Sequence, residues 1–374
     1  MISRVKCSEF HSGALSNFGK SEFPLKIMGL TNAYDPSRQS AMNSDISMHQ
    51  KTPMLAPKRN RTESQDANEQ AHQLTRWQQE YTQLSGGRFY GCLDELVLEQ
   101  VQVFQEFTNQ ALYQQCQIDK DSLWLGIPAR DQLCRINGQA VQANRIMCRS
   151  GDEHFELMTP DSFAIYGLVV NRAALQQVAA LQGLPLAVDR LVQPPLLLLP
   201  EGVLTQLRTL LDLWLAHHPQ PQPQAARLQQ DFIQTMVLQI LQQQQLDDAP
   251  VGMTRRAQIH RQAVVRKVQT YVEAHPEEVL TITQACAIAH VSRRTLQYSF
   301  ESVLGVSPLQ FLRCQRLNQV RRALLTGDAE QTVADTAARW GFWHAGQFGK
   351  DYKALFAEPP SATLAQGRRQ RGCN

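Results

Sequence analysis

The stretch ITQACAIAHVSRRTLQYSFESVL, residues 282–304, decides the fold of the C-terminal third of this 374-residue chain. Apolar residues recur in it at the three- and four-residue spacing of an amphipathic helix. Thr281 and Ser292 are residue types that cap helix N-termini. The pattern therefore predicts two short helices, residues 282–289 and 293–304.

Only His290 and Val291 fall in the turn between these two helices. Two short helices joined by so tight a turn are typical of a helix-turn-helix unit. A glycine usually occupies the turn, and His290 stands there instead. Histidine tolerates a left-handed backbone better than most residues, so the departure is small.

The sequence on either side extends this plan. Residues 261–275 have the apolar periodicity of a preceding helix, and residues 308–325 predict a long, arginine-rich helix. Beyond it, residues 333–340 and 344–356 repeat the two-helix pattern around a turn at Gly341. Two helix-turn-helix units joined by one stiff helix could meet successive major grooves of DNA.

Polar residues occupy the outward side of each second helix if the apolar side faces the core. Arginine can form two hydrogen bonds with a guanine edge and glutamine with an adenine edge, whereas lysine commonly contacts phosphates. The alternative for each residue is an ordinary solvated position. The predicted DNA contacts are Arg293, Arg294, Gln297, Tyr298, Arg316, Arg321, Gly346, Gln347, Lys350 and Lys353.

Charge is distributed unevenly along the chain. Residues 253–374 contain 17 Lys and Arg against 9 Asp and Glu, a net +8, while the whole chain is +3, which leaves −5 for residues 1–252. A basic C-terminal third suggests a polyanionic partner. We expect a cytoplasmic protein without a membrane span, because no long apolar run or signal pattern occurs.

The N-terminal part is predicted to combine strands and helices. Trp77, Tyr81 and Leu84 have the spacing of a short amphipathic helix. Short strand-like segments follow at residues 93–107, 122–128, 143–148 and 163–170, and they suggest a small sheet or barrel. Helical periodicity then appears at residues 173–181, 203–214 and 225–244. The apolar stripe of the last helix suits either a homodimer face or burial within its own domain.

These patterns together predict an α+β chain with a mixed sheet and helix domain for effector sensing and dimerisation, and an all-α double helix-turn-helix domain. The predicted divisions are a disordered extension at residues 1–70, the effector domain at 71–246, a linker at 247–261, the DNA-binding domain at 262–366 and a basic tail at 367–374.

The C-terminal motifs resemble the DNA-binding domain of the AraC/XylS family of transcription regulators. The resemblance rests on His290-Val-Ser-Arg-Arg-Thr-Leu-Gln297, Arg316-Leu-Asn-Gln-Val-Arg-Arg322 and Trp340-Gly-Phe-Trp-His-Ala-Gly-Gln-Phe348. It covers residues 262–366. It implies binding to double-stranded promoter DNA and, usually, transcription activation through RNA polymerase.

A narrower resemblance, to regulators of ethanolamine utilisation within this family, includes the N-terminal part. It rests on Trp77-Gln-Gln79, Val101-Gln-Val-Phe-Gln-Glu-Phe107, Trp124-Leu-Gly-Ile-Pro-Ala129 and Phe155-Glu-Leu-Met-Thr-Pro-Asp161. It implies ethanolamine and adenosylcobalamin as effectors rather than as catalytic cofactors. Another catabolic operon with a different small-molecule effector is the alternative.

Aromatic faces and a carboxylate suit a small cation. The candidate effector residues are therefore Trp77, Trp124, Phe155 and Glu156, and ordinary packing is the alternative for each.

A second class of function is a DNA-binding module fused to an enzyme that takes alkyl groups from damaged DNA. Such an enzyme needs an activated cysteine or a zinc site. The four cysteines between residues 92 and 148 are separated by 24, 18 and 14 residues, unlike usual zinc-ligand spacings, which favours simple burial. We therefore expect no catalytic residue and no metal site. A constitutive architectural DNA binder is a third class, and the large acidic N-terminal part argues against it.

Overall fold

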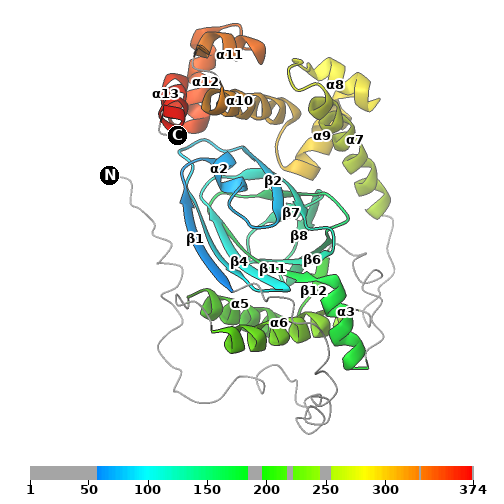
Figure 1. Ribbon diagram of the computed structural model, residues 1–374. Coiled ribbons are helices and arrows are strands. Elements are labelled where there is room, and N and C mark those ends of the chain that lie inside the picture. Colours follow the sequence, from blue (N-terminus) through cyan, green and yellow to red (C-terminus); the bar gives the residue numbers. More distant parts are fainter. Residues whose placement is uncertain (1–56, 184–195, 217–221, 245–253, 328–329, 373–374) are drawn as a thin grey trace.

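The computed structural model describes residues 57–183, 196–216, 222–244, 254–327 and 330–372. Two antiparallel sheets form the centre of the molecule, with one group of helices on each side (Figure 1). No helix within these ranges is long and apolar enough to cross a membrane. Most of the extension predicted to be disordered, residues 1–56, lies outside them.

The larger sheet has seven strands in the order β1-β3-β4-β11-β6-β9-β12, and each neighbouring pair is antiparallel. Its strands are β1 (Lys58–Ser64), β3 (Gly91–Val97), β4 (Val101–Thr108), β6 (Ser122–Pro128), β9 (Arg145–Ser150), β11 (Phe163–Asn171) and β12 (Leu196–Leu198).

The smaller sheet has five strands in the order β2-β5-β10-β7-β8. Its strands are β2 (Trp77–Gln83), β5 (Leu112–Ile118), β7 (Cys134–Ile136), β8 (Gln139–Val141) and β10 (Phe155–Thr159). Because side chains alternate along a strand, each of these strands presents one face to the larger sheet and the other face away from it.

Large aromatic side chains fill the space between the two sheets. Phe104, Trp124 and Phe155 are buried there in one apolar cluster. Glycines on the strands provide the room that these rings need. A Cβ atom at Gly126 would lie 2.2 Å from the ring of Trp124, and one at Gly167 would lie 2.1 Å from the ring of Phe104.

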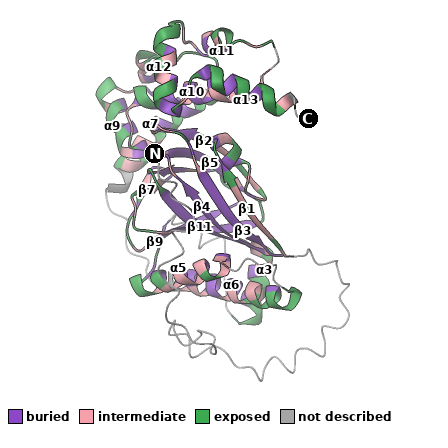
Figure 2. Cartoon of the chain, turned by 90° about the vertical axis from the view of Figure 1, so that its left-hand side faces the viewer, coloured by how far each residue is buried: buried purple, intermediate pink, exposed green. Residues whose placement is uncertain are grey.

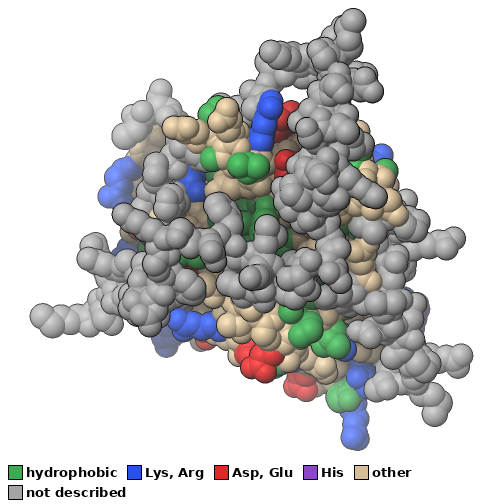
Figure 3. Space-filling view, turned by 90° about the horizontal axis from the view of Figure 1, so that it is seen from below, with side chains coloured by type: hydrophobic (Ala, Val, Ile, Leu, Met, Phe, Trp, Pro, Cys, Tyr) green, Lys and Arg blue, Asp and Glu red, His purple; other side chains and the backbone are tan. Residues whose placement is uncertain are grey.

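Three helices cover the outer face of the larger sheet: α3 (Arg172–Leu181), α5 (Glu201–Ala216) and α6 (Pro223–Gln244). Leu211 of α5 and Ile233 of α6 are buried against Val103 and Leu168 of the strands. The strands between the two helical layers are mostly buried (Figure 2). Figure 3 shows the molecule from the side of these three helices. Both acidic and basic side chains occur among the residues coloured by type on this face, and neither sign dominates.

The C-terminal domain consists of helices and lies on the opposite side of the sheets. Its helices are α7 (Thr254–Ala274), α8 (Ile282–Ala289), α9 (Arg293–Leu304), α10 (Pro308–Thr326), α11 (Val333–Arg339), α12 (Ala345–Phe356) and α13 (Pro360–Gly372). Their apolar core continues into the outer face of the smaller sheet through Leu84, Tyr113 and Met158. The rings of Tyr113 and Phe311 meet edge to face, with centroids 5.3 Å apart.

The structure corrects three of the sequence expectations. Residues 58–70 are part of the fold, because β1 pairs with β3 and the short helix α2 (Ala67–Ala71) follows it. Residues 77–83 form strand β2, not a helix. Helix α7 begins at Thr254, within the expected linker. Helix α13 includes most of the residues expected to form the basic tail. The mixed α+β architecture is confirmed.

Candidate nucleic-acid interface

Helices α8 and α9 have the caps and the turn that the sequence predicts. The Thr281 hydroxyl accepts a hydrogen bond from the Gln284 amide at 3.2 Å, and the Thr281 amide donates to the Gln284 side chain at 2.9 Å. The Ser292 hydroxyl accepts one from the Thr295 amide at 3.2 Å. Between the helices, His290 adopts φ 57° and ψ 45°, the left-handed conformation expected for it.

The outward face of α9 carries the polar residues that were singled out. Leu296 and Phe300 are buried on its apolar side. Neither Arg293 nor Arg294 forms an ion pair within the described part of the chain, so both cations face solvent unpaired. The four exposed candidates of this helix are Arg293, Arg294, Gln297 and Tyr298.

Two of these side chains are held in place by neighbours. The Gln297 amide donates to the Glu301 carboxylate at 2.6 Å. The Arg261 guanidinium of α7 lies 4.6 Å from the ring centroid of Tyr298. Contacts of this kind reduce the side-chain freedom that a binding event would otherwise have to remove.

Helices α11 and α12 form a second pair with a comparable turn. The Thr332 hydroxyl caps α11 by accepting from the Asp335 amide at 3.1 Å. Gly341 in the turn has φ 77°, and a Cβ atom there would lie 1.9 Å from Val279. Phe348 and Tyr352 anchor α12 in the core. The turn at Gly341 lies where the sequence predicts it.

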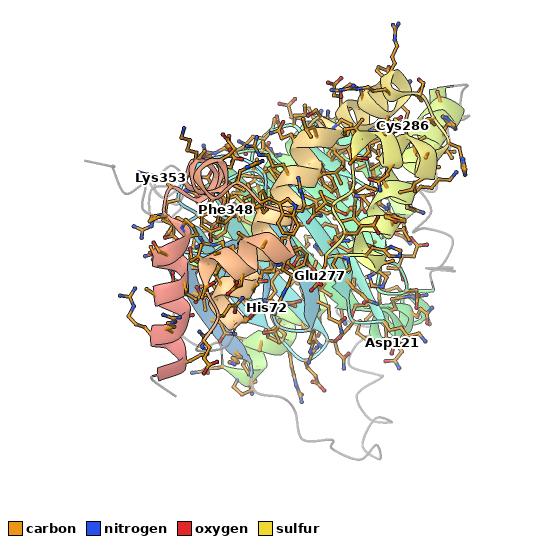
Figure 4. The ribbon with its side chains drawn as sticks, turned by 90° about the horizontal axis from the view of Figure 1, so that it is seen from above. His72, Asp121, Glu277, Cys286, Phe348 and Lys353 are labelled. Atoms are coloured by element: carbon orange, nitrogen blue, oxygen red, sulfur yellow. The ribbon has the colours of Figure 1, made fainter. Side chains whose placement is uncertain are left out.

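The outward face of α12 also carries its candidates. The Gln347 amide donates to the Asp351 carboxylate at 2.7 Å, and Asp351 forms an ion pair with Arg313 of α10. In both α9 and α12, therefore, a glutamine side chain donates a hydrogen bond to a carboxylate one helical turn further along the same helix. Seen from above, Cys286 of α8 and Lys353 of α12 lie at opposite ends of the helical domain (Figure 4). The exposed candidates of α12 are Gly346, Gln347, Lys350 and Lys353.

Arg316 of α10 packs within the helical domain instead of projecting into solvent. Its guanidinium lies 5.1 Å from the ring centroid of Phe342, beside the turn at Gly341. Burial lowers the pKa of Arg316 from its usual value. In this arrangement Arg316 braces the second turn, which does not fit its predicted role as a DNA contact.

Arg321 likewise does not fit its predicted role, because it contacts the N-terminal domain. Its Nε lies 2.6 Å from Asp66, and its NH1 lies 2.7 Å from Glu358. The Arg321 side chain is only 12% exposed. Burial alone would lower the pKa of Arg321, but Asp66 and Glu358 raise it above the usual value. A phosphate could reach this cation only by displacing two carboxylates.

Several polar contacts join α10 to the N-terminal domain, and we call three of them the interdomain clamp: Asp66–Arg321, Glu80–Arg322 and Gln83–Asn318. In the last, the Gln83 amide donates to the Asn318 side chain at 3.0 Å, and Asn318 donates back to the Gln83 carbonyl at 3.0 Å. The sequence did not reveal these contacts, because it holds no local signal for partners more than 230 positions apart.

The four candidate effector residues do not gather at one place. Trp124 and Phe155 stack with ring centroids 4.9 Å apart, and Trp77 meets Trp124 edge to face at 5.8 Å. Glu156 faces the other side of β10, where it accepts a hydrogen bond from Tyr113 at 2.9 Å. The three aromatic residues therefore pack in the core between the sheets. Glu156 instead lies at the junction with α7, where Gln269 donates a hydrogen bond to Tyr113.

A small pocket beside the clamp has a volume of about 30 Å³, enough for one or two water molecules. Its lining includes Arg88, Arg321 and Glu358.

Three buried cysteines of the N-terminal domain do not have the character of an activated nucleophile. Burial raises the pKa of the Cys134 and Cys148 thiols to about 12. Burial also raises the pKa of Cys116 well above its usual value. Such thiols stay protonated and unreactive. The described ranges contain no group of three or more His, Cys, Asp or Glu residues that could hold a metal ion.

Comparisons with known proteins identify the helical region. Residues 285–366 match a family described as a helix-turn-helix domain. The probable thc operon regulatory protein of Rhodococcus erythropolis is 39% identical over 102 residues, which are 27% of this chain and 31% of that protein. The XylDLEGF operon transcriptional activator 2 of Pseudomonas putida is 26% identical over 121 residues, 32% of this chain and 77% of that protein.

A solved structure adds a further similarity. It is that of a probable AraC family transcriptional regulator from Rhodopseudomonas palustris CGA009, which is 34% identical. The match covers 28% of this chain and 96% of that one, with a TM-score of 0.26. The chain spans about a third of the length of the Rhodococcus relative. The family match identifies residues 285–366 as similar to helix-turn-helix domains.

Proposed function

We propose that this protein is a sequence-specific, DNA-binding regulator of transcription of the AraC/XylS family. The observation that carries the proposal is the helix-turn-helix domain at residues 285–366, with unpaired cations on the exposed face of α9. Arg294 and Gln297 have the chemistry to bind purine edges in a major groove. Lys350 and Lys353 of α12 supply positive charge for phosphates.

Two helix-turn-helix units in one chain form the core of this proposal. The pairs α8–α9 and α11–α12 share their plan of caps, turn and buried anchors. Helix α10 joins them and has 19 residues. At 1.5 Å per residue it is about 28 Å long, which is close to one turn of DNA at roughly 34 Å. A single chain could then read two successive major grooves.

The N-terminal domain is proposed to receive a small-molecule signal. The interdomain clamp holds α10 against the smaller sheet. A conformational change in that sheet would therefore be transmitted to α10, which joins the two helix-turn-helix units. An effector that favours one docking arrangement would shift the population able to meet both grooves.

Ethanolamine with adenosylcobalamin is the effector pair that the sequence resemblance suggests, and genes for ethanolamine use are the corresponding target. An activator of another catabolic operon, responding to another small molecule, is the second candidate, and the separation of Glu156 from Trp77, Trp124 and Phe155 favours it. In either case the proposed partners are promoter DNA, RNA polymerase and, through the helices on the larger sheet, a second copy of the chain.

The test combines binding with transcription. The purified chain is titrated with DNA from its own upstream region and from an ethanolamine-operon promoter at fixed salt, and a reporter is measured in parallel. Tighter specific binding or reporter activation with both effectors supports the first candidate. Specific binding that ignores them leaves the regulator and discards that effector pair, whereas equal affinity for random DNA refutes the proposal.

A further inference from the structure

An exposed tryptophan lies at the start of α12 and has no role in the packing described above. Trp343 is 75% exposed, more than any other large hydrophobic residue in the described ranges. A side chain of this size is usually well buried in a folded protein. It precedes His344, the N-cap of α12, in the turn that follows Gly341.

The surface of α12 next to the Trp343 ring has no side chain at two glycine positions. Gly346 and Gly349 are helical, and a Cβ atom added at either would meet nothing within 4 Å. Glycine weakens a helix interior relative to alanine. No contact within the described residues requires glycine at positions 346 and 349. A partner could therefore approach the α12 backbone closely while Trp343 stands at its end.

Exposed cations on the two helices that flank Trp343 in the sequence favour DNA as this partner. They are Arg339 of α11 and Lys350 and Lys353 of α12. The carboxylate of Asp351 on α12 is paired with Arg313. This surface also continues directly into the proposed DNA-facing residues of α12, whose Gln347 is one helical turn from Trp343.

We propose that Trp343 reads thymine, by packing its indole ring against the C5-methyl group of a thymine in the major groove met by α12. The inference rests on the proposed function and deepens it. The thymine methyl is the one apolar group on the major-groove edge of the bases, so it is the feature that an exposed aromatic ring can recognise there. Polar side chains of α9 and α12 have no comparable way to detect it.

The experiment removes that methyl group and nothing else. Duplexes that bind the wild-type chain are first selected from a random library. Each thymine in the selected site is then replaced by deoxyuridine, one at a time, and affinity is measured at fixed salt. Loss of one buried methyl is expected to weaken wild-type binding about fourfold at one or two positions in the α12 half of the site.

The Trp343→Ala variant should bind the site more weakly and should no longer distinguish thymine from deoxyuridine at those positions. Trp343→Phe should retain part of the discrimination. Because the ring is exposed, both variants should melt at the wild-type temperature. The variant Arg294→Ala is the matched control: it should lose affinity while keeping the full response to deoxyuridine.

Two results would overturn the inference. One is a Trp343→Ala variant with wild-type affinity or with an unchanged deoxyuridine profile. The other is a variant that binds DNA normally but fails to activate a reporter, which would assign the ring to a protein partner. If the wild-type chain selects no sequence at all, the proposed function fails, and this inference fails with it.

Discussion

Removing the guanidinium of Arg321 should destabilise the protein and leave the electrostatics of DNA binding unchanged. The side chain lies between Asp66 and Glu358, which are 5% and 17% exposed. The variant Arg321→Met keeps most of the apolar stem and removes the guanidinium, whose carbon lies 4.8 Å from the ring centroid of Phe356. Both carboxylates then lose their cation in a partly buried site.

The size of the effect follows from this burial. Breaking a buried ion pair by removing one partner costs about 3 to 5 kcal/mol, because the other charge stays buried. Asp66 also accepts hydrogen bonds from the Asn68 and Glu69 amides at 2.9 and 3.2 Å, which continue to stabilise it. We therefore expect the low end, about 3 kcal/mol. In urea this corresponds to a midpoint lower by about 1 M or more.

The assay measures urea unfolding and the salt dependence of DNA binding on the same samples. Lys353→Ala is the matched control, because Lys353 is exposed and is predicted to contact a phosphate. Lys353→Ala should keep the wild-type stability and reduce the slope of log affinity against log salt by about 0.9. Arg321→Met should show the opposite pair of results. An Arg321→Met variant with wild-type stability and a smaller salt slope would refute this account of Arg321.

Further predictions concern a buried carboxylate and two glycines. Burial raises the pKa of Glu106 to about 7 from 4.5, so its contribution to stability is complete below pH 4.5 and is lost as pH rises through 7. Glu106→Gln should therefore be more stable than wild type at pH 8, by on the order of 3 kcal/mol, and should differ little from wild type at pH 4.5. The same difference in melting temperature between variant and wild type at both pH values would contradict this. Gly341→Ala should lower stability by about 1 to 2 kcal/mol, since a left-handed residue gains a Cβ. Gly349→Ala should raise it by up to about 1 kcal/mol in the same melting assay, and equal effects of the two alanines would contradict the geometry at Gly341.

The helical domain was predictable from the sequence because its signals are local. Thr281 and Ser292 mark helix starts through hydrogen bonds to residues three positions away. The same is true of the left-handed turn at His290, which depends on one residue. For these reasons the bounds of α8 and α9 agree with the expected ranges, residues 282–289 and 293–304.

Strand β2 was assigned to a helix for a physical reason. Trp77 and Tyr81 are four residues apart, a spacing that is close to one helical turn and is also twice the period of a strand. In the structure both side chains lie on the inner side of β2. Strand β1, with the sequence KRNRTES, has no apolar alternation to reveal it, and its pairing with β3 decides its conformation.

The candidate site residues likewise divide into those with a local sequence signal and those that depend on distant contacts. Exposed positions on α9 and α12 follow from helical periodicity, so their orientation was predicted correctly, while their contacts with DNA stay predictions. The ion pair of Arg321 with Asp66 joins residues 255 positions apart, which no local pattern reveals. For Phe155 and Glu156 a signal did exist: consecutive residues in a strand face opposite sides, so both could not line one site.

The most direct test of the central claim is a guanine-methylation footprint on a selected site, which reports contacts in the major groove. The account predicts two protected regions about 10 base pairs apart. Arg294→Ala should lose protection of guanine in one region and keep it in the other. A single protected region, or loss of both regions in this variant, would contradict the claim that α9 and α12 read successive grooves.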